Sequence, residues 1–164
     1  EILLDGVWLH SGDVGMIHPN GALQIVDRAK NIFKLSQGEY IAPEKLENIY
    51  IQSPWIAQAW IHGTSLNDFA ILIAVIDPDK FKTYKGGSGS DEDKLKDSAF
   101  IQIIRDECLR LATENKLNSL EKPKGFYLTL DPFTIENDLL TPTMKLKRNV
   151  ARDRFAAQIV AVYE

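Results

Sequence analysis

Two short runs near the start of the chain predict a β-hairpin. Residues 14–17 and 22–27 have the length and the mainly apolar composition of strands. Between them lies His18-Pro19-Asn20-Gly21, and Asn-Gly is a strong signal for a tight turn between antiparallel strands. A further short extended segment is expected at 32–35.

The next pattern has helical spacing. Pro43 suits the first turn of a helix, and Leu46, Ile49 and Tyr50 recur at the spacing of one helix face. Ser53-Pro54 ends this pattern, because proline disfavours continuation of a helix.

Two strands are expected after this helix, at 55–62 and 69–76, with Asn67-Asp68 as the turn between them. The second run contains Ala-Ile-Leu-Ile-Ala-Val-Ile without interruption. A strand that is apolar at every position is buried on both faces, so we expect it at the centre of its sheet.

The second half of the chain mixes helices with one strand. We expect a short helix at 78–84, a longer helix after Ser90, a strand at 126–130 and a terminal helix at 149–162. Ser90 followed by Asp93 predicts a capping box at the start of the longer helix. Because helices and mostly hairpin-joined strands are intermixed, the expected fold class is α+β.

Residues 86–90, Gly-Gly-Ser-Gly-Ser, have the composition of a flexible linker, either engineered or natural. No strand precedes them and no Gly-Lys-Ser or Gly-Lys-Thr follows them, which argues against a phosphate-binding loop.

Composition narrows the class of protein. The 164 residues are 45% hydrophobic and carry a net charge of -4, which fits a folded domain and argues against a general nucleic-acid binder. No run approaches the roughly 18 apolar residues of a membrane span. The chain begins Glu-Ile-Leu-Leu without Met, so we expect it to be a piece of a larger protein.

Residue types that often hold metals or act as nucleophiles give little signal. Cys108 is the single cysteine and lies in an apolar-periodic stretch, so a buried structural thiol is favoured over a nucleophile. His10, His18 and His62 have no metal-ligand spacing, and we expect no metal site.

Polar residues around the hairpin suit a nucleotide. A carboxylate such as Asp13 can accept hydrogen bonds from both ribose hydroxyls, and Arg28 offers a rigid set of donors. The plainer interpretations are a turn-forming aspartate and a surface ion pair worth about 0–1 kcal/mol. Lys30 and Lys34 can be solvated lysines, and Gly38 either a turn glycine or a point of close ligand approach.

Positive charge gathers near the end of this acidic chain. Residues 145–154 contain five lysines or arginines and one aspartate, a local net charge of +4. Such a run is usually a solvated helix face. Pro142 and the threonines beside it predict a non-helical segment, so we expect Lys145 to project from a loop, where it can neutralise a phosphate.

Two segments, in the same order along the chain, resemble motifs of a known family. Residues 37–50 read Gln-Gly-Glu-Tyr-Ile-Ala-Pro-Glu-Lys-Leu-Glu-Asn-Ile-Tyr, and residues 140–148 read Leu-Thr-Pro-Thr-Met-Lys-Leu-Lys-Arg. With Ser-Gly-Asp at 11–13, they resemble the C-terminal portion of the adenylate-forming superfamily of acyl-CoA synthetases, luciferases and peptide-synthetase adenylation domains. The long-chain fatty acyl-CoA synthetases are the most similar branch, and the resemblance covers the chain except 86–90.

The resemblance implies a fold and a division into domains. It implies a small C-terminal lid domain in which an N-terminal β-hairpin precedes a small central sheet flanked by helices. Residues 1–29 would be the terminal hairpin of a large N-terminal domain and the approach to a hinge, and residues 30–164 would be the lid.

The resemblance also implies roles for the candidate residues around the hairpin. Asp13 would hold the ribose hydroxyls, Arg28 would contact the ribose region of the nucleotide, and Lys30 would be the hinge. Lys34 and Gly38 would lie on the face presented to CoA for thioester formation.

Lys145 would be the catalytic lysine that enters the cleft for adenylation. The general family pattern has Gly-Lys at this point, whereas Met144 precedes Lys145 here and the segment is shorter. Lys147 is therefore the alternative for this role.

The implied activity is that of a long-chain fatty acid–CoA ligase, which uses ATP, Mg²⁺ and CoA. We expect the isolated chain to be soluble, to bind none of them alone and to have little or no activity without the large N-terminal domain. The full-length enzyme would be membrane-associated on the cytoplasmic side of the endoplasmic reticulum, mitochondrial or peroxisomal membrane. The alternatives are the lid of another acid–CoA ligase, for a medium-chain or aromatic acid, and a non-catalytic binding module.

Overall fold

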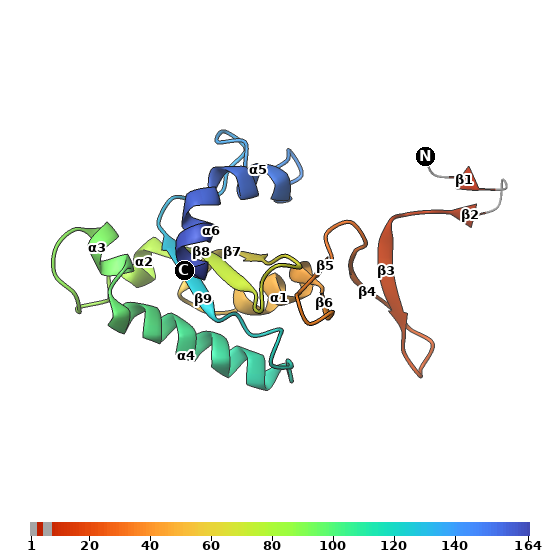
Figure 1. Ribbon diagram of the computed structural model, residues 1–164, viewed down its shortest axis with the longest axis horizontal. Coiled ribbons are helices and arrows are strands. Elements are labelled where there is room, and N and C mark those ends of the chain that lie inside the picture. The colour runs from red at the N-terminus through yellow and green to blue at the C-terminus, as the bar shows by residue number, and fades with distance from the viewer. Residues whose placement is uncertain (1–2, 5–7) are drawn as a thin grey trace.

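A three-stranded sheet forms the centre of the computed structural model, which describes residues 3–4 and 8–164 (Figure 1). Its strands are β7 (Ile56–His62), β8 (Ile71–Ile76) and β9 (Gly125–Thr129), with β8 in the middle. β7 runs antiparallel to β8, and β9 runs parallel to it. Every residue of β8 is buried, which confirms the predicted central strand.

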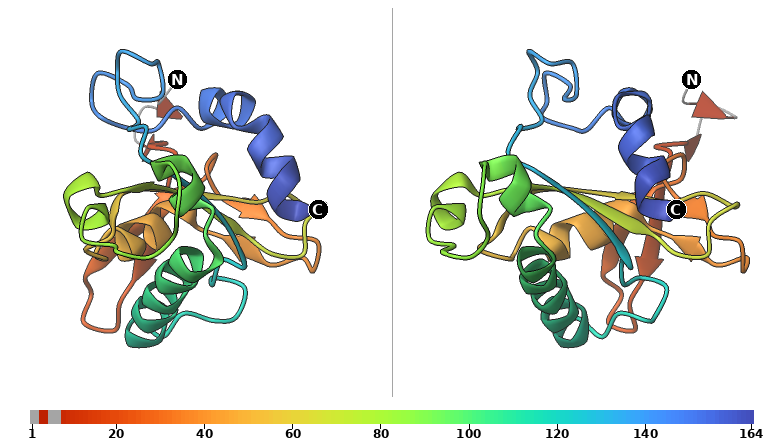
Figure 2. Two further views of the ribbon diagram at one scale, coloured as in Figure 1. Left: turned by 90° about the vertical axis from the view of Figure 1, so that its left-hand side faces the viewer. Right: turned by 60° about the vertical axis from the view of Figure 1, so that its left-hand side comes forward.

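Helices cover both faces of this sheet. α1 (Pro43–Tyr50) and α4 (Ser98–Glu114) pack on one face, and α5 (Arg148–Arg154) and α6 (Ala156–Tyr163) pack on the other (Figure 2). Successive residues of β8 point to opposite faces and supply the two cores in turn. The first core contains Leu72, Ala74 and Ile76, and the second contains Ile71, Ile73 and Val75. This arrangement confirms the α+β class.

The parallel pairing of β8 with β9 requires a crossover connection. The chain makes it through α2 (Pro78–Phe81), α3 (Asp91–Leu95) and α4. The linker at 86–90 lies between α2 and α3. Local patterning does not specify this crossover, because strand direction depends on where the distant helix packs.

The single long helix predicted after Ser90 is wrong, since α3 ends at Leu95 and α4 begins at Ser98. The predicted capping box is confirmed at α3, where the Ser90 and Asp93 side chains bond each other's backbone N–H groups. Asp97 then caps α4 by accepting from the Ala99 N–H at 3.0 Å. A second N-cap side chain of this kind marks a new helix start.

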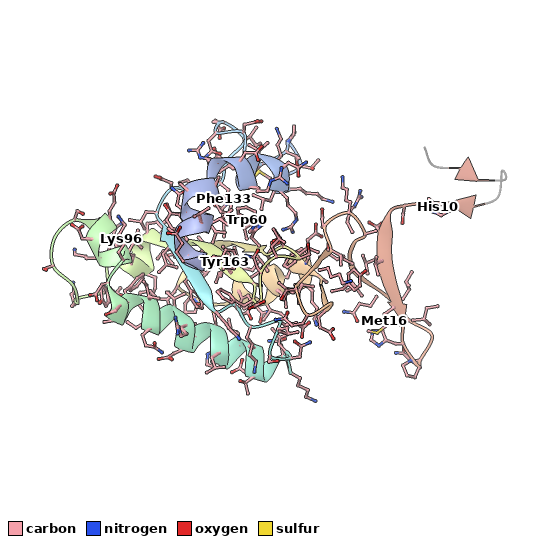
Figure 3. All side chains as sticks on the ribbon, in the orientation of Figure 1. His10, Met16, Trp60, Lys96, Phe133 and Tyr163 are labelled. Atoms are coloured by element: carbon pink, nitrogen blue, oxygen red, sulfur yellow. The ribbon has the colours of Figure 1, made fainter. Side chains whose placement is uncertain are left out.

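The single terminal helix predicted at 149–162 is also wrong, because it is broken at Phe155. The Phe155 ring is buried, with its centroid 6.2 Å from that of Trp60 and 5.9 Å from that of Phe133. Figure 3 labels Trp60 and Phe133. The bend lets Val150 of α5 and Ile159 of α6 both pack on the second core. Burial of these side chains outweighs the continuity of one helix.

The N-terminal hairpin consists of β3 (Asp13–Ile17) and β4 (Leu23–Arg28), and it extends away from the central sheet (Figure 1). The Asn-Gly turn is confirmed, with the Gly21 N–H donating to the His18 carbonyl at 2.8 Å. Two shorter strands, β1 (Leu3–Leu4) and β2 (Trp8–Leu9), pair with each other before it.

A second small hairpin follows the first. It pairs β5 (Phe33–Lys34) with β6 (Tyr40–Ile41). Sequence patterning predicted the first of these strands but not β6, because two residues are too few to show a period.

Candidate functional site

Asp13 and Arg28 lie opposite each other in the N-terminal hairpin. They are cross-strand partners, and the Arg28 Nε donates to an Asp13 carboxylate oxygen at 3.0 Å. Both side chains remain partly exposed, so the pair adds little stability and stays accessible to a ligand. The hairpin register thus joins a carboxylate and a guanidinium that are far apart in the sequence.

Lys30 lies in the turn that connects this hairpin to the rest of the chain. The N–H groups of Asn31 and Ile32 both donate to the Arg28 carbonyl, at 2.9 and 3.3 Å. The Lys30 side chain is exposed. A short exposed turn between two packed elements can absorb a change of backbone angles, as a hinge requires.

Lys145 lies in a tight loop, as predicted. Leu140 and Leu146 form an isolated bridge, and the Thr141 N–H donates to the Lys145 carbonyl at 2.8 Å. The turn is closed by the Met144 N–H, which donates to the Thr141 carbonyl at 2.9 Å. The loop therefore holds the Lys145 backbone firmly while its side chain is exposed.

The two candidate lysines differ in their surroundings. The Lys147 ammonium forms an ion pair with Asp138, and its backbone N–H donates to the Leu139 carbonyl at 2.8 Å. No ion pair of Lys145 is found in the described part of the chain. Lys145 can therefore reach a ligand without breaking an ion pair, whereas Lys147 would have to leave Asp138.

A cavity of about 670 Å³ brings several of the predicted residues together. Arg28 and Lys30 line it from the hairpin side, and Lys145 lines it from the loop. Glu44 is the one carboxylate side chain in the lining, against six cationic ones, namely Arg28, Lys30, Lys145, Lys147, Arg148 and Arg152. Ion pairs engage four of these cations, and Lys30 and Lys145 are the two that form none within the described residues. These two lysines favour an anionic ligand in the cavity.

His62 also lines this cavity, beside Trp60. Burial, with a smaller contribution from the positive charge of Arg152, lowers the pKa of His62 to about 4. The imidazole is therefore neutral near pH 7, and the positive charge of the cavity comes from its lysines and arginines.

Lys34 and Gly38 lie elsewhere, in the β5–β6 hairpin, and do not line the cavity. Gly38 has a φ of 93° and closes the turn, with its N–H donating to the Leu35 carbonyl at 2.9 Å. The hairpin is tied to the β7–β8 turn, because Ser36 donates its hydroxyl to Asp68 at 2.5 Å. Arg28, Lys30 and Lys145 thus lie on one surface, and Lys34 and Gly38 lie on another. Asp13 contacts Arg28 but is not among the residues that line the cavity.

One structural pair in this region was missed by sequence reasoning. Arg148 donates two hydrogen bonds to the Glu47 carboxylate, both at 2.7 Å, and Glu47 also accepts from the Ile61 N–H at 2.9 Å. Burial raises the pKa of Glu47, while the guanidinium opposes that change. Arg148 belongs to the charge run, which the sequence predicts to be a solvated helix face. No local pattern distinguishes this one arginine, whose side chain is only 18% exposed.

A metal site, a membrane-spanning helix and a reactive thiol each have requirements that the described residues can be compared with. Within residues 3–4 and 8–164, no group of three or more His, Cys, Asp or Glu side chains is placed to hold a metal ion. In that same part of the chain, no helix is both long and apolar enough to cross a membrane. Cys108 is buried, which raises the pKa of its thiol to about 12 and confirms the expected structural thiol.

No family model matches the chain. It is 46% identical over 167 residues to long-chain-fatty-acid–CoA ligase 5 of Mus musculus and 45% identical over 166 residues to long-chain-fatty-acid–CoA ligase 6 of Rattus norvegicus. These alignments cover 100% and 99% of this chain but only 24% of each relative.

A solved structure supports the same grouping. The A domain of the carboxylic acid reductase from Segniliparus rugosus, in complex with AMP and a co-purified carboxylic acid, matches with a TM-score of 0.83 at 30% identity. The match covers 99% of this chain and 24% of that one.

The fold places the chain in the class of C-terminal domains of adenylate-forming enzymes. Its sequence narrows the class: the chain belongs to the long-chain-fatty-acid–CoA ligase family, and it spans about a quarter of the length of the curated relatives it matches.

Proposed function

We propose that the whole protein joins a long-chain fatty acid to CoA, and that this chain is its C-terminal lid with the preceding hairpin. The observation that carries the proposal is that Arg28, Lys30 and Lys145 line the same cavity. The similarity to long-chain-fatty-acid–CoA ligases supports the choice of acid. Residues 1–29 are assigned to the large domain and residues 30–164 to the lid.

In the first step, a fatty-acid carboxylate oxygen attacks the α-phosphorus of ATP, forming an acyl-adenylate and releasing pyrophosphate. Negative charge on the reacting oxygens rises in the transition state. The Lys145 ammonium is assigned to these oxygens, where it lowers the barrier because it binds the transition state more strongly than the ground state. Its exposure at the edge of the cavity supports this role.

Asp13 and Arg28 are assigned to the ribose. The Asp13 carboxylate can accept from the two ribose hydroxyls, while Arg28, at 3.0 Å from it, holds the carboxylate in place and adds donors of its own. These residues fix the nucleotide relative to Lys145 and so reduce the entropy lost on reaching the reactive geometry.

In the second step, the CoA sulfur attacks the acyl carbonyl carbon and AMP leaves. We assign Lys30 as the pivot on which the lid turns between steps, and Lys34 and Gly38 to the face then presented to CoA. Two facts support this division: Lys30 lies in an exposed turn, and Lys34 and Gly38 do not line the cavity that holds Lys145.

The fatty-acid pocket, the adenine pocket and the Mg²⁺ site are assigned to parts of the enzyme outside this chain. The large N-terminal domain is the proposed partner that supplies the fatty-acid and adenine pockets. The described residues offer no carboxylate cluster for Mg²⁺, so we assign none of them to it. For the full-length enzyme we propose association with the cytoplasmic side of a membrane.

The proposal is tested with the purified full-length enzyme that contains this segment. Pyrophosphate release and acyl-CoA formation are measured with a long-chain, a medium-chain and an aromatic acid, each with ATP and CoA. We expect the highest kcat/KM for the long-chain acid. A preference for the aromatic or medium-chain acid would assign the lid to another acid–CoA ligase, and absence of both products with all three acids would refute the ligase activity.

A further inference from the structure

Asp27, the residue before Arg28, is a buried carboxylate with a contact across the hinge. Its side chain is almost fully enclosed, at 1% exposure. One carboxylate oxygen accepts from the Arg28 N–H at 2.6 Å, and the other accepts from the Glu44 N–H at 2.8 Å. Glu44 belongs to the first turn of α1.

This contact replaces a missing local cap. The N-cap residue of α1 is Ala42, which has no side-chain hydrogen bond to offer. The first N–H groups of a helix need acceptors, and a carboxylate there is also favoured by the helix dipole. Asp27 therefore supplies from the hairpin what the sequence of α1 lacks.

The position of Asp27 gives this cap a second consequence. Asp27 precedes Lys30 and Glu44 follows it, so the bond joins the two sides of the proposed hinge. Asn31, just past Lys30, also bonds α1, donating its amide to the Glu44 carboxylate at 2.7 Å. The asparagine bond lies on the lid side and can move with α1, whereas the Asp27 bond cannot survive a large rotation about Lys30.

α1 is also linked by side-chain contacts to the loop that carries Lys145. Glu47, one turn along this helix, holds Arg148, which lies three residues after Lys145. The orientation of α1 relative to the hairpin thus determines whether Lys145 and Arg28 line one cavity.

We propose that Asp27 is a positioning residue that holds the lid in the adenylation orientation by capping α1 across the hinge. This inference rests on the proposed function for its catalytic consequence but not for the orientation itself. Loss of the cap removes a contact present in one orientation only, so it shifts the equilibrium away from that orientation.

The first test separates the two half-reactions in the full-length enzyme. Asp27→Ala should lower the rate of acyl-adenylate formation about tenfold, the effect of losing one cap on a two-state equilibrium, with thioester formation from supplied acyl-adenylate changed less than about twofold. The rate of acyl-adenylate formation in Asp27→Asn should fall between those of the unaltered enzyme and Asp27→Ala, because one amide oxygen replaces two carboxylate acceptors. This milder variant also serves if Asp27→Ala folds poorly.

Asp77→Ala is the matched control. Asp77 caps α2 by accepting from the Lys80 N–H at 2.7 Å, so it is the same type of contact made entirely within the lid. Its loss should reduce stability without changing the ratio of the two half-reactions. An equal change of that ratio in both variants would show that Asp27 is merely structural and overturn the proposal.

A distance measurement tests the orientation independently of activity. Spin labels are placed at Gln24→Cys, an exposed position of β4 on the face opposite Leu23 and Ile25, and at Thr113→Cys, an exposed position at the end of α4. They report the hairpin-to-lid distance by pulsed electron resonance in a full-length enzyme freed of other reactive cysteines. Asp27→Ala should broaden or shift the distribution, and Asp77→Ala should not. An unchanged distribution overturns the proposal. A shift in an enzyme that forms no acyl-adenylate would refute the proposed function and leave the cross-hinge cap established.

Discussion

Lys145 owes its position to the residue before it. Met144 has a φ of 60°, in the left-handed region where glycine is favoured. If Lys145 corresponds to the lysine of the general adenylate-forming pattern, Met144 stands where that pattern has glycine. A glycine would suit this position, because the turn from Thr141 to Met144 needs that backbone conformation. Methionine tolerates it at a cost of about 1–2 kcal/mol.

Lys145→Ala in the full-length enzyme should lower the rate of acyl-adenylate formation about 100-fold to 1,000-fold, the usual loss for one preorganised donor. Thioester formation from supplied acyl-adenylate should be nearly unchanged. Pyrophosphate exchange and CoA consumption measure the two steps separately. Lys147→Ala is the control, because Lys147 already pairs with Asp138; a larger adenylation loss in Lys147→Ala would reverse the assignment of the two lysines.

Gly38→Leu should give the opposite pattern, with a slowed thioester step and nearly normal adenylation. A leucine side chain would occupy the surface proposed for CoA, and its backbone at a φ of 93° would add strain of about 1–3 kcal/mol. Gly38→Ala separates the two effects, because a Cβ there meets only the Lys34 Cε, at 3.7 Å. If alanine slowed the thioester step as much as leucine, strain rather than bulk would be the cause.

At the scale of elements, α1 connects the parts of the site. Its N-terminus meets Asp27, its buried face packs in the first core, and its Glu47 binds Arg148 at the start of α5. The two side chains are only 13% and 18% exposed, so each would be costly to leave without its partner. The pair fixes the start of α5, and with it the loop that carries Lys145.

Arg148→Ala should therefore lower the free energy of unfolding of this chain by about 3–5 kcal/mol, because Glu47 is left buried without its partner. Chemical denaturation measures the change. Arg110→Ala is the control: Arg110 pairs with Glu107 and Glu114 on the exposed face of α4, where a loss of about 0.2–1 kcal/mol is expected. Equal losses in the two variants would contradict the role given to burial.

At the scale of the whole molecule, the N-terminal hairpin exposes apolar surface. Ile17, Leu23 and Ile25 are 76%, 66% and 57% exposed, and the hairpin stands apart from the central sheet (Figure 1). Adjacent exposed apolar side chains mark a surface that another structure covers. The curated relatives are about four times as long as this chain, and we propose that the large domain covers the hairpin.

The isolated chain should accordingly show no pyrophosphate release with fatty acid, ATP and CoA, because the acid and adenine pockets belong to the proposed large domain. The full-length enzyme under the same conditions is the positive control. Sustained turnover by the isolated chain would contradict the proposed division of the active site.

Prediction from sequence was most accurate where the signal is local. The Asn-Gly turn, the buried β8 run and the capping box at Ser90 each depend on a few neighbouring residues. Prediction was wrong where distant packing competes with local pattern. The break at Phe155 follows from burial of one ring against the sheet. The break before Ser98 has a different, local cause that the pattern of apolar residues does not show, namely the cap supplied by Asp97.

The sequence by itself determined the order of the elements, the α+β class and the family resemblance, because periodicity, caps and turns are encoded over short stretches. It also indicated Lys145, Arg28 and Asp13 as candidates. Only the tertiary structure decided that Arg28 and Lys145 line one cavity, that Arg148 is buried against Glu47 and that Asp27 caps α1. Those contacts join distant segments, and their energies depend on burial, which no local pattern specifies.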